Sequence, residues 1–390
     1  MRENQENRHV FDEENPSNID VDFDALLGEL ESLRHKPRLT GSEIANMIYA
    51  VYASARRDVR TPDDTPEHAQ DSYKPDEEDV RKLAEERIKP LLDSIVEKIR
   101  NECGDAGSFA VLPEALKLVS GEESKRLTAQ NKTENVKKGD FVAMAEYYPY
   151  KKTIAIDENY TPLRPSEIIA SLADSGYGVA PTALHHEFIH AQQSTPKEIK
   201  NKILKEIAEN VGFTLLLNAT MAFAWPAAPL VGGGWIARGA QRNALKRKKE
   251  IVKEAHAHFG SQRHTSVWSS LGDYAQHMEI SYSDLFKTPE DMDRLLAATQ
   301  AVRRLYALGL TDGDIGELVK TATWDKKRLG YGALEDAVDE RVRQKGIEEE
   351  DLDNLVLADD IRRKIYVEKV RLIAQEELKK FYNAATQSSI

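Results

Sequence analysis

The chain has a single cysteine, Cys103, among its 390 residues. One thiol cannot build an internal disulfide framework, and it cannot supply the several thiolates of a cysteine-based zinc site. The first twenty residues are polar and lack the apolar core of a secretory signal peptide, so we expect no Sec export. These absences predict a soluble or peripheral protein of the cytoplasm.

Positive charge is also in deficit. The chain carries 66 acidic and 54 basic residues, for a formal net charge of -12 at pH 7. Such a balance would repel a phosphate backbone, so general nucleic-acid binding is excluded as the main function. Hydrophobic residues make up 41% of the chain and charged residues 31%, which is enough for a globular core beneath a strongly solvated surface.

Helical periodicity dominates the sequence, and the best strand candidates are residues 141–144 and 153–156. The pattern predicts an α+β fold that is predominantly helical, with a small β-sheet ahead of a helix over 181–193. Ser42 is expected to cap a helix in the N-terminal region. The expected divisions are a disordered tail over 1–20, an N-terminal helical region over 21–59, an acidic proline-rich linker over 60–78, and a main domain over 79–390.

The motif that carries chemistry is His186-Glu187-Phe188-Ile189-His190, an HExxH pattern. On a helix the two histidines lie four residues apart, so both imidazoles project from one face and can bind one metal ion. Glu187 sits beside that face, where it can take a proton from a water molecule on the metal. The surrounding residues are small or apolar, so these polar side chains need partners, and Zn²⁺ would supply one. The motif therefore predicts zinc ligands at His186 and His190 and a general base at Glu187.

A zinc hydrolase needs a third protein ligand and one open position. No glycine and histidine follow the motif in the metzincin manner, because residues 191–200 read AQQSTPKEIK. The sequence leaves three downstream glutamates open as the third ligand. Glu206 and Glu209 lie on the next expected helix, and Glu279 lies in the segment HMEISYSDLF.

The order of these features resembles the CAAX-prenyl-protease and heat-shock-protease family of gluzincins over roughly residues 140–290. Members of that family have HExxH, then a long and partly hydrophobic insertion, and then a helix with a ligand Glu in an ExxxD pattern. The resemblance implies a zincin-like catalytic domain and favours Glu279 as the third zinc ligand. Asp284 follows Glu279 by five residues instead of four, which is a rotation of about 100° on a helix.

Several other polar residues could take part in the site or have structural roles. His185 is expected to point away from the metal-binding face, as a supporting or surface side chain. One of the remaining candidates could stabilise the oxyanion that forms during peptide hydrolysis. These candidates are His256, His258, His264, His277 and Tyr282.

Residues 210–237 contain no charged side chain, and a basic tract follows at 246–249. The segment is interrupted by two prolines and by a run of three glycines. One interpretation is a buried helix followed by a turn inside the catalytic domain. The other is a membrane-inserting hairpin with the basic residues beside anionic head groups.

The sequence thus predicts a zinc-dependent endopeptidase that acts on protein or peptide substrates, with no organic cofactor and a possible association with a membrane surface. Two alternatives stay open. One is a catalytically silent zincin-fold binding module, and the other is a membrane-docked protein that acts through residues 210–237. The sequence does not determine the substrate or the oligomeric state.

Overall fold

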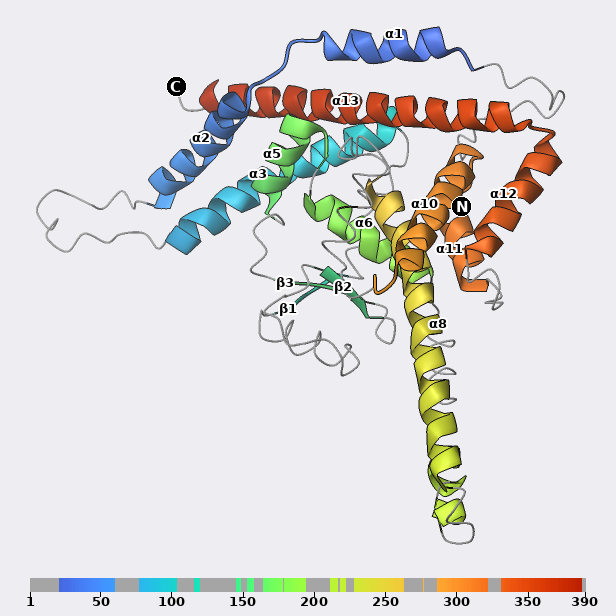
Figure 1. Ribbon diagram of the computed structural model, residues 1–390. Helices are drawn as coiled ribbons and strands as arrows, with labels where there is room; N and C mark the ends of the chain where they lie inside the picture. The colour runs from blue at the N-terminus through green and yellow to red at the C-terminus, as the bar shows by residue number, and fades with distance from the viewer. Residues whose placement is uncertain are drawn as a thin grey trace, which may run out of the picture.

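The computed structural model shows a predominantly helical protein (Figure 1). It describes residues 21–59, 77–103, 116–119, 145–148, 153–157, 164–177, 179–193, 211–216, 218–221, 228–262, 276, 286–321 and 331–387. The predicted tail over 1–20 and most of the predicted linker over 60–78 therefore lie outside the described residues.

The helices differ widely in length, and α8 and α13 are the longest of those described. Their bounds are α1 (Phe23–Arg34), α2 (Gly41–Val59), α3 (Glu77–Cys103), α5 (Pro165–Ser175), α6 (Val179–Gln192), α8 (Ala228–Gln262), α10 (Pro289–Ala307), α11 (Asp312–Thr321), α12 (Gly332–Lys345) and α13 (Glu349–Gln387). Residues 211–216 and 218–221 are also helical.

A three-stranded sheet precedes α5 and α6 in the chain. Its strands are β1 (Leu116–Val119), β2 (Ala145–Tyr148) and β3 (Thr153–Asp157), in the order β1-β3-β2. β1 pairs with β3 in parallel and β2 pairs with β3 antiparallel. Among the described strands β2 is thus at an edge, on the side that faces α6. The strand predicted over 153–156 is confirmed within β3, while residues 141–144 lie outside the described residues.

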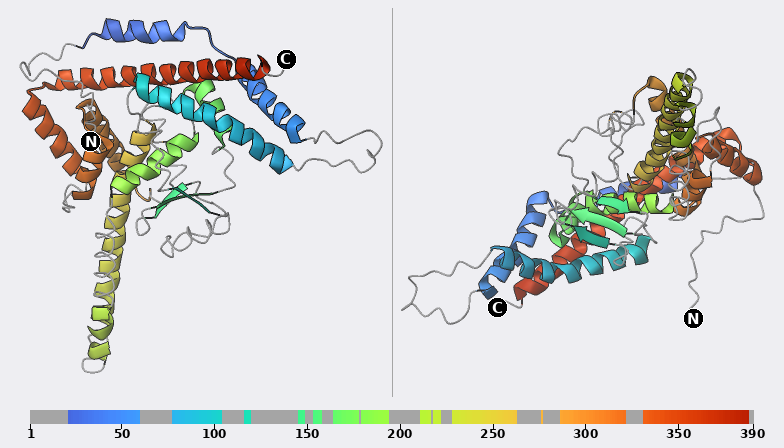
Figure 2. Two further views of the ribbon diagram at one scale, coloured as in Figure 1. Left: turned by 180° about the vertical axis from the view of Figure 1, so that it is seen from behind. Right: turned by 90° about the horizontal axis from the view of Figure 1, so that it is seen from below.

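One apolar core joins the two ends of the chain. Helices α2, α3, α5 and α13 pack around it, with Ile44, Ile95, Leu172 and Val370 among its buried members. Helices α3 and α5 both pack against α13, and Figure 2 shows α3 crossing it at an angle. The apolar spacing of α13 explains its buried side, because Ile361, Ile365, Val370, Ile373 and Leu378 are all buried. The N-terminal helices are therefore part of the same packed body as the C-terminal helix.

A second core surrounds the inner end of α8. It is built from α8, α10, α11, α12 and the start of α13, and it includes Ile251, Val252, Leu295 and Leu305. The spacing of Ile251, Val252 and Ala255 directs one face of α8 into this core. The packing fixes the inner end of α8 against α6, which carries the HExxH motif.

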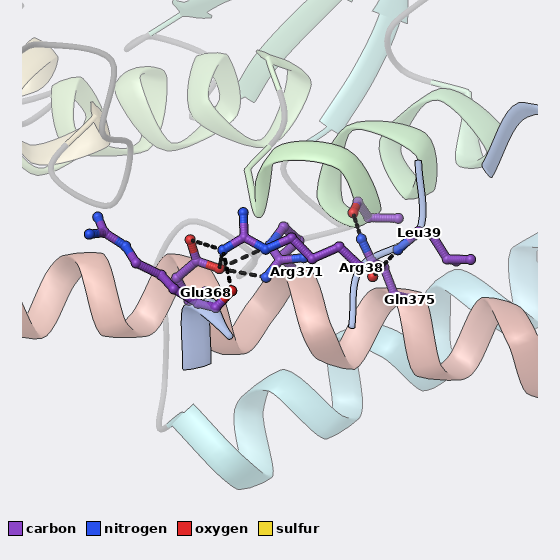
Figure 3. A network of polar contacts seen from close by, with 7 residues as sticks. Arg38, Leu39, Glu368, Arg371 and Gln375 are labelled. Carbon is purple, nitrogen blue, oxygen red and sulfur yellow. Dashed lines mark hydrogen bonds and ion pairs between the residues drawn. The ribbon is translucent and has the colours of Figure 1, made fainter. Parts of the chain in front are cut away.

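A polar network ties the connection between α1 and α2 to α13 (Figure 3). The buried Gln375 of α13 accepts a hydrogen bond from Leu39 N at 2.9 Å and donates one to Ala173 O at 2.7 Å. On the same side, Glu368 pairs with Arg38 at 3.3 Å and with Arg371 at 2.6 Å. Gln375 thereby links three segments that are far apart in the sequence.

The outer end of α8 projects away from the rest of the molecule (Figure 1). The described side chains of the uncharged stretch are mostly exposed, including Leu215, Leu216 and Ile236. The interpretation of this stretch as a buried helix is therefore wrong for these residues. Within the described part of the chain, none of the helices has both the length and the apolar character that crossing a membrane requires.

Candidate metal centre

Helix α6 presents the HExxH motif as the sequence predicts. The expected helix over 181–193 is confirmed by α6, which runs from Val179 to Gln192. His186 and His190 lie one turn apart, and their Nε2 atoms are 3.0 Å from each other. Both imidazoles therefore direct the same ring nitrogen at one point.

Helix α8 brings a third donor to that point. Glu254 Oε2 lies 3.4 Å from His186 Nε2, and Glu254 Oε1 lies 3.5 Å from His190 Nε2. Nitrogen and oxygen ligands bind Zn²⁺ at about 2.0–2.1 Å, so neighbouring ligands of a tetrahedral ion are about 3.3 Å apart. The three observed separations fall on either side of this value. The spacing of His186, His190 and Glu254 therefore fits the three protein ligands of a tetrahedral zinc site.

A glycine allows the close approach of α6 and α8. A Cβ atom on Gly260 would lie 2.6 Å from Ile189 Cδ1 and 2.5 Å from the Tyr306 hydroxyl oxygen. Real Cβ atoms do not reach such distances, so a larger residue would require the side chains of Ile189 and Tyr306, or α8 itself, to shift. Gly260 lies within two turns of Glu254 on the same helix. The spacing of the site thus depends on a residue that contributes no ligand.

The electrostatics of the site favour a bound cation. Burial opposes the charge on Glu254, but His190 and His186 outweigh it and hold the pKa of this carboxyl well below its ordinary value. Burial also lowers the pKa of His190, yet Glu254, with help from Glu187 and Gln193, raises it to about 9. The surroundings that stabilise a protonated imidazole here also favour a divalent cation, which would displace that proton.

Glu187 lies between α6 and the edge strand. Its Oε2 accepts a hydrogen bond of 2.8 Å from Tyr147 N on β2. Burial raises the pKa of Glu187, against the opposing influence of His190, His186 and the Tyr147 N–H. A raised pKa brings a carboxylate closer to the working range of a general base at neutral pH.

A second layer of hydrogen bonds orients His190. Gln193 Oε1 accepts from His190 Nδ1 at 2.9 Å, which leaves Nε2 directed at the centre. Gln193 Nε2 in turn donates to Lys253 O at 3.0 Å and lies 2.9 Å from His256 Nδ1. Because Lys253 precedes Glu254, this one amide ties the end of α6 to the part of α8 that carries the carboxylate.

His185 has a structural place on the opposite side of α6. Only 1% of it is exposed, and its Nε2 lies 2.7 Å from Asp312 Oδ2 at the start of α11. The Tyr306 hydroxyl donates to the other oxygen of Asp312 at 2.7 Å. His185 does point away from the metal-binding face, as expected, and it is a buried supporting residue instead of a surface one.

His258 lies one turn beyond Glu254 and packs edge-on against His186, with ring centroids 4.7 Å apart. His186, Glu254 and His258 each offer a ligand atom, and these atoms lie within 4.8 Å of one another. His190 offers a further ligand atom, since its Nε2 lies 3.0 Å from His186 Nε2 and 3.5 Å from Glu254 Oε1. His258 is therefore placed to face a group bound at the centre, and His256 instead contacts Gln193.

The structure does not describe the three glutamates that the sequence offered as the third zinc ligand. Glu206, Glu209 and Glu279 lie outside the described residues, as do His264, His277 and Tyr282. Sequence reasoning passed over Glu254, although a signal was present. Glu254 and His258 are four residues apart in the segment EAHAH, so on a helix they share one face.

Comparisons with known proteins give no relative for this chain. No family model, no curated protein and no solved structure matches it.

Proposed function

We propose that this protein is a zinc-dependent endopeptidase. One observation carries the proposal: His186, His190 and Glu254 direct their ligand atoms at one point, with Glu187 beside it on the same helix. The donor set of two imidazoles and one carboxylate is typical of catalytic zinc sites, in which the fourth position stays open for water or substrate. A purely structural zinc site would instead be closed by a fourth protein ligand.

The proposed ligand set differs from the one that the family resemblance favours. Glu254 takes the place of Glu279, and His258 stands four residues after it, where the family pattern has Asp. The order of HExxH, uncharged insertion and ligand helix is kept, because residues 210–237 lie between α6 and Glu254. This arrangement supports a divergent zincin-like domain in which α8 is the ligand helix.

The residues around the centre have separate tasks in peptide hydrolysis. When bound, Zn²⁺ would polarise the scissile carbonyl and lower the pKa of a water molecule. The Glu187 carboxylate would accept a proton from the attacking water and then deliver it to the leaving amine nitrogen. Gln193 would hold His190 in the tautomer that keeps Nε2 available. His258 would donate a hydrogen bond to the developing oxyanion.

The edge strand supports a peptide as the substrate. β2 pairs with β3 on one side only among the described strands, and its Tyr147 N–H already points toward Glu187. An extended peptide could pair with this edge and bring a backbone carbonyl next to the centre. Recognition through main-chain hydrogen bonds would make the enzyme tolerant of many side chains.

The central test is Glu187→Gln in the full-length protein, with casein or a mixed peptide library as substrate. We expect one equivalent of zinc by elemental analysis, as in the wild type, and a loss of turnover of at least about 10²-fold, the lower end for a general base. Wild-type turnover in this variant would contradict the proposed mechanism. Stoichiometric zinc without hydrolysis of any peptide by the wild type would favour a silent binding module.

The ligand assignment is tested by Glu254→Gln with Glu250→Gln as the matched control. Glu250 lies one turn earlier on α8 and pairs with Lys253 at 3.5 Å. We expect Glu254→Gln to weaken zinc binding by at least about tenfold in a chelator competition, and Glu250→Gln to leave it unchanged. Unchanged binding in Glu254→Gln, with a loss in Glu279→Gln, would transfer the role to Glu279.

A further inference from the structure

The outer end of α8, with the helical residues 211–216 and 218–221 that precede it in the chain, carries an unusual share of exposed apolar surface. Among the described residues, eight large hydrophobic side chains are exposed, and five of them are in this region. They are Val211, Leu215, Leu216, Met221 and Ile236, with exposed fractions from 45% to 73%. A cluster of this kind on a projecting element is typical of a surface that docks on a partner.

The charges next to this cluster all have one sign. Residues 210–249 contain six basic residues, Arg238, Arg242, Lys246, Arg247, Lys248 and Lys249, and not one carboxylate. Arg238 is exposed and stands two residues after Ile236. Arg247 pairs with Asp291 of α10 at 3.2 Å. The six residues are called the basic group below. The segment is therefore apolar at its end and positive behind it, in a chain with a net charge of -12.

We propose that this outer end inserts shallowly into the interface of an anionic membrane. The exposed side chains of 211–221 and Ile236 would enter the boundary of the acyl chains, and Arg238 would lie at the level of the head groups. Shallow insertion requires no spanning helix.

The charge pattern favours a membrane over a second copy of the chain. A symmetric pair that buried these apolar residues against each other would bring two basic groups together, and like charges would repel. An anionic surface would attract the basic group and repel the acidic remainder of the molecule. Attraction and repulsion would together orient the protein with only this end on the membrane.

The test is co-sedimentation of the full-length protein with vesicles, in the presence of a chelator so that zinc plays no part. Vesicles of pure phosphatidylcholine are compared with vesicles in which about a third of the lipid is the anionic phosphatidylserine. We expect strong preference for the anionic vesicles and a decline in binding as salt is raised. Arg238→Gln should weaken binding by roughly fivefold, the effect of one basic residue near such a surface.

The apolar contribution is tested by Leu216→Asp with Leu357→Asp as the control. Leu216 is 56% exposed, and Leu357, on α13, is 50% exposed, so both changes add one charge at a similarly exposed leucine. We expect Leu216→Asp to reduce vesicle binding by at least about tenfold and Leu357→Asp to leave it unchanged. Equal binding of both variants, or no preference for anionic vesicles, would overturn the proposal. A dimer in sedimentation that Leu216→Asp dissociates, without vesicle binding by the wild type, would also overturn it.

Discussion

Gln193 shows how one side chain beyond the ligands can control a metal centre. It accepts from His190 Nδ1 and donates to the backbone of α8 at Lys253. An apolar replacement would remove both bonds and let the imidazole rotate or change tautomer. The amide therefore sets the direction of a ligand and the position of the helix that carries another.

We predict that Gln193→Leu weakens zinc binding by 10- to 100-fold, the usual effect of losing such an outer partner. Gln193→Glu keeps an oxygen that can accept from His190 Nδ1, so it should recover most of the affinity. Competition with a chromophoric chelator measures both variants against the wild type. Equal affinity in Gln193→Leu and Gln193→Glu would show that Gln193 has no orienting role.

A second residue-scale feature joins three helices far from the metal centre. The Tyr52 hydroxyl of α2 donates to Glu85 of α3 and lies 3.1 Å from Ser166 Oγ at the start of α5. Ser166 also donates to Glu85 from its backbone N–H at 3.1 Å. Burial, together with the hydrogen bond to Glu85, raises the pKa of Tyr52 to about 12.

The raised pKa of Tyr52 predicts a specific pH dependence of stability. Tyrosine in an unfolded chain ionises near pH 10, so the unfolded state gains from ionisation before the folded state does. The contribution of Tyr52 is fully present below about pH 10 and is lost as the pH rises to 12. We expect Tyr52→Phe to be less stable by about 1 kcal/mol at pH 8.

That difference from the wild type should shrink when urea unfolding is repeated above pH 10. Tyr49→Phe is the control, because Tyr49 is on the same helix and is 69% exposed. Its stability should match the wild type at both pH values. A constant difference for Tyr52→Phe across this range would contradict the proposed linkage.

At the scale of elements, the packing of α6 on α8 decides whether the site exists. A Cβ on Gly260 would meet the side chains of Ile189 and Tyr306, whereas none of the described residues lies within 4 Å of a Cβ placed on Gly239 of the same helix. We predict that Gly260→Ala lowers zinc affinity by at least about tenfold, because a shift of the helix separates Glu254 from the histidines.

Gly239→Ala serves as the matched control for that substitution. It should leave zinc affinity unchanged and should stabilise α8 slightly, because alanine favours a helix by about 0.8–1.0 kcal/mol over glycine. Zinc titration and thermal unfolding of the two variants separate the effect on the site from the effect on the helix. Equal zinc affinity in both would show that contact with Ile189 does not set the spacing.

Local patterns predicted the elements better than the contacts between them. The HExxH helix and the buried side of α13 follow from spacing within one segment. The predicted cap of α2 was two residues too late. Thr40, and not Ser42, exchanges hydrogen bonds with Glu43 at the start of the helix. Such an offset is common where several capping residues stand in a row.

The choice of Glu254 could not follow from spacing alone. It depends on how α8 crosses α6, and that crossing is set by Gly260 and by the core around Ile251 and Leu295. These contacts join residues that are more than forty positions apart, so no local periodicity contains them. The sequence also could not predict that Leu216 and Ile236 are exposed, because an uncharged segment suits a buried helix and a membrane surface equally well.

At the scale of the whole molecule, Gln375 connects the N-terminal helices to the body. Its amide satisfies Leu39 N and Ala173 O, and it is only 3% exposed. We predict that Gln375→Leu lowers the free energy of unfolding by about 2–4 kcal/mol, since a buried carbonyl and a partly buried N–H lose their partner. Chemical denaturation provides the measurement.

Gln344→Leu provides the reference for that loss. Gln344 is an exposed residue of α12 whose amide donates to Glu340 at 2.8 Å. Its replacement should change stability by no more than about 0.5 kcal/mol. A similar loss of unfolding free energy in both variants would show that the hydrogen bonds of Gln375 do not stabilise the fold more than those of an exposed residue.

The continuity of α8 sets a distance as well as a contact. Sixteen residues separate Arg238 from Glu254, and at 1.5 Å per residue the rise is about 24 Å. With its outer end on a membrane, the rigid helix would hold the metal centre no more than about 24 Å above the head groups. An extended peptide gains about 3.3 Å per residue. A membrane-anchored substrate would thus need a free stalk of no more than about seven residues to reach the centre, and deletions in such a stalk would locate the cut.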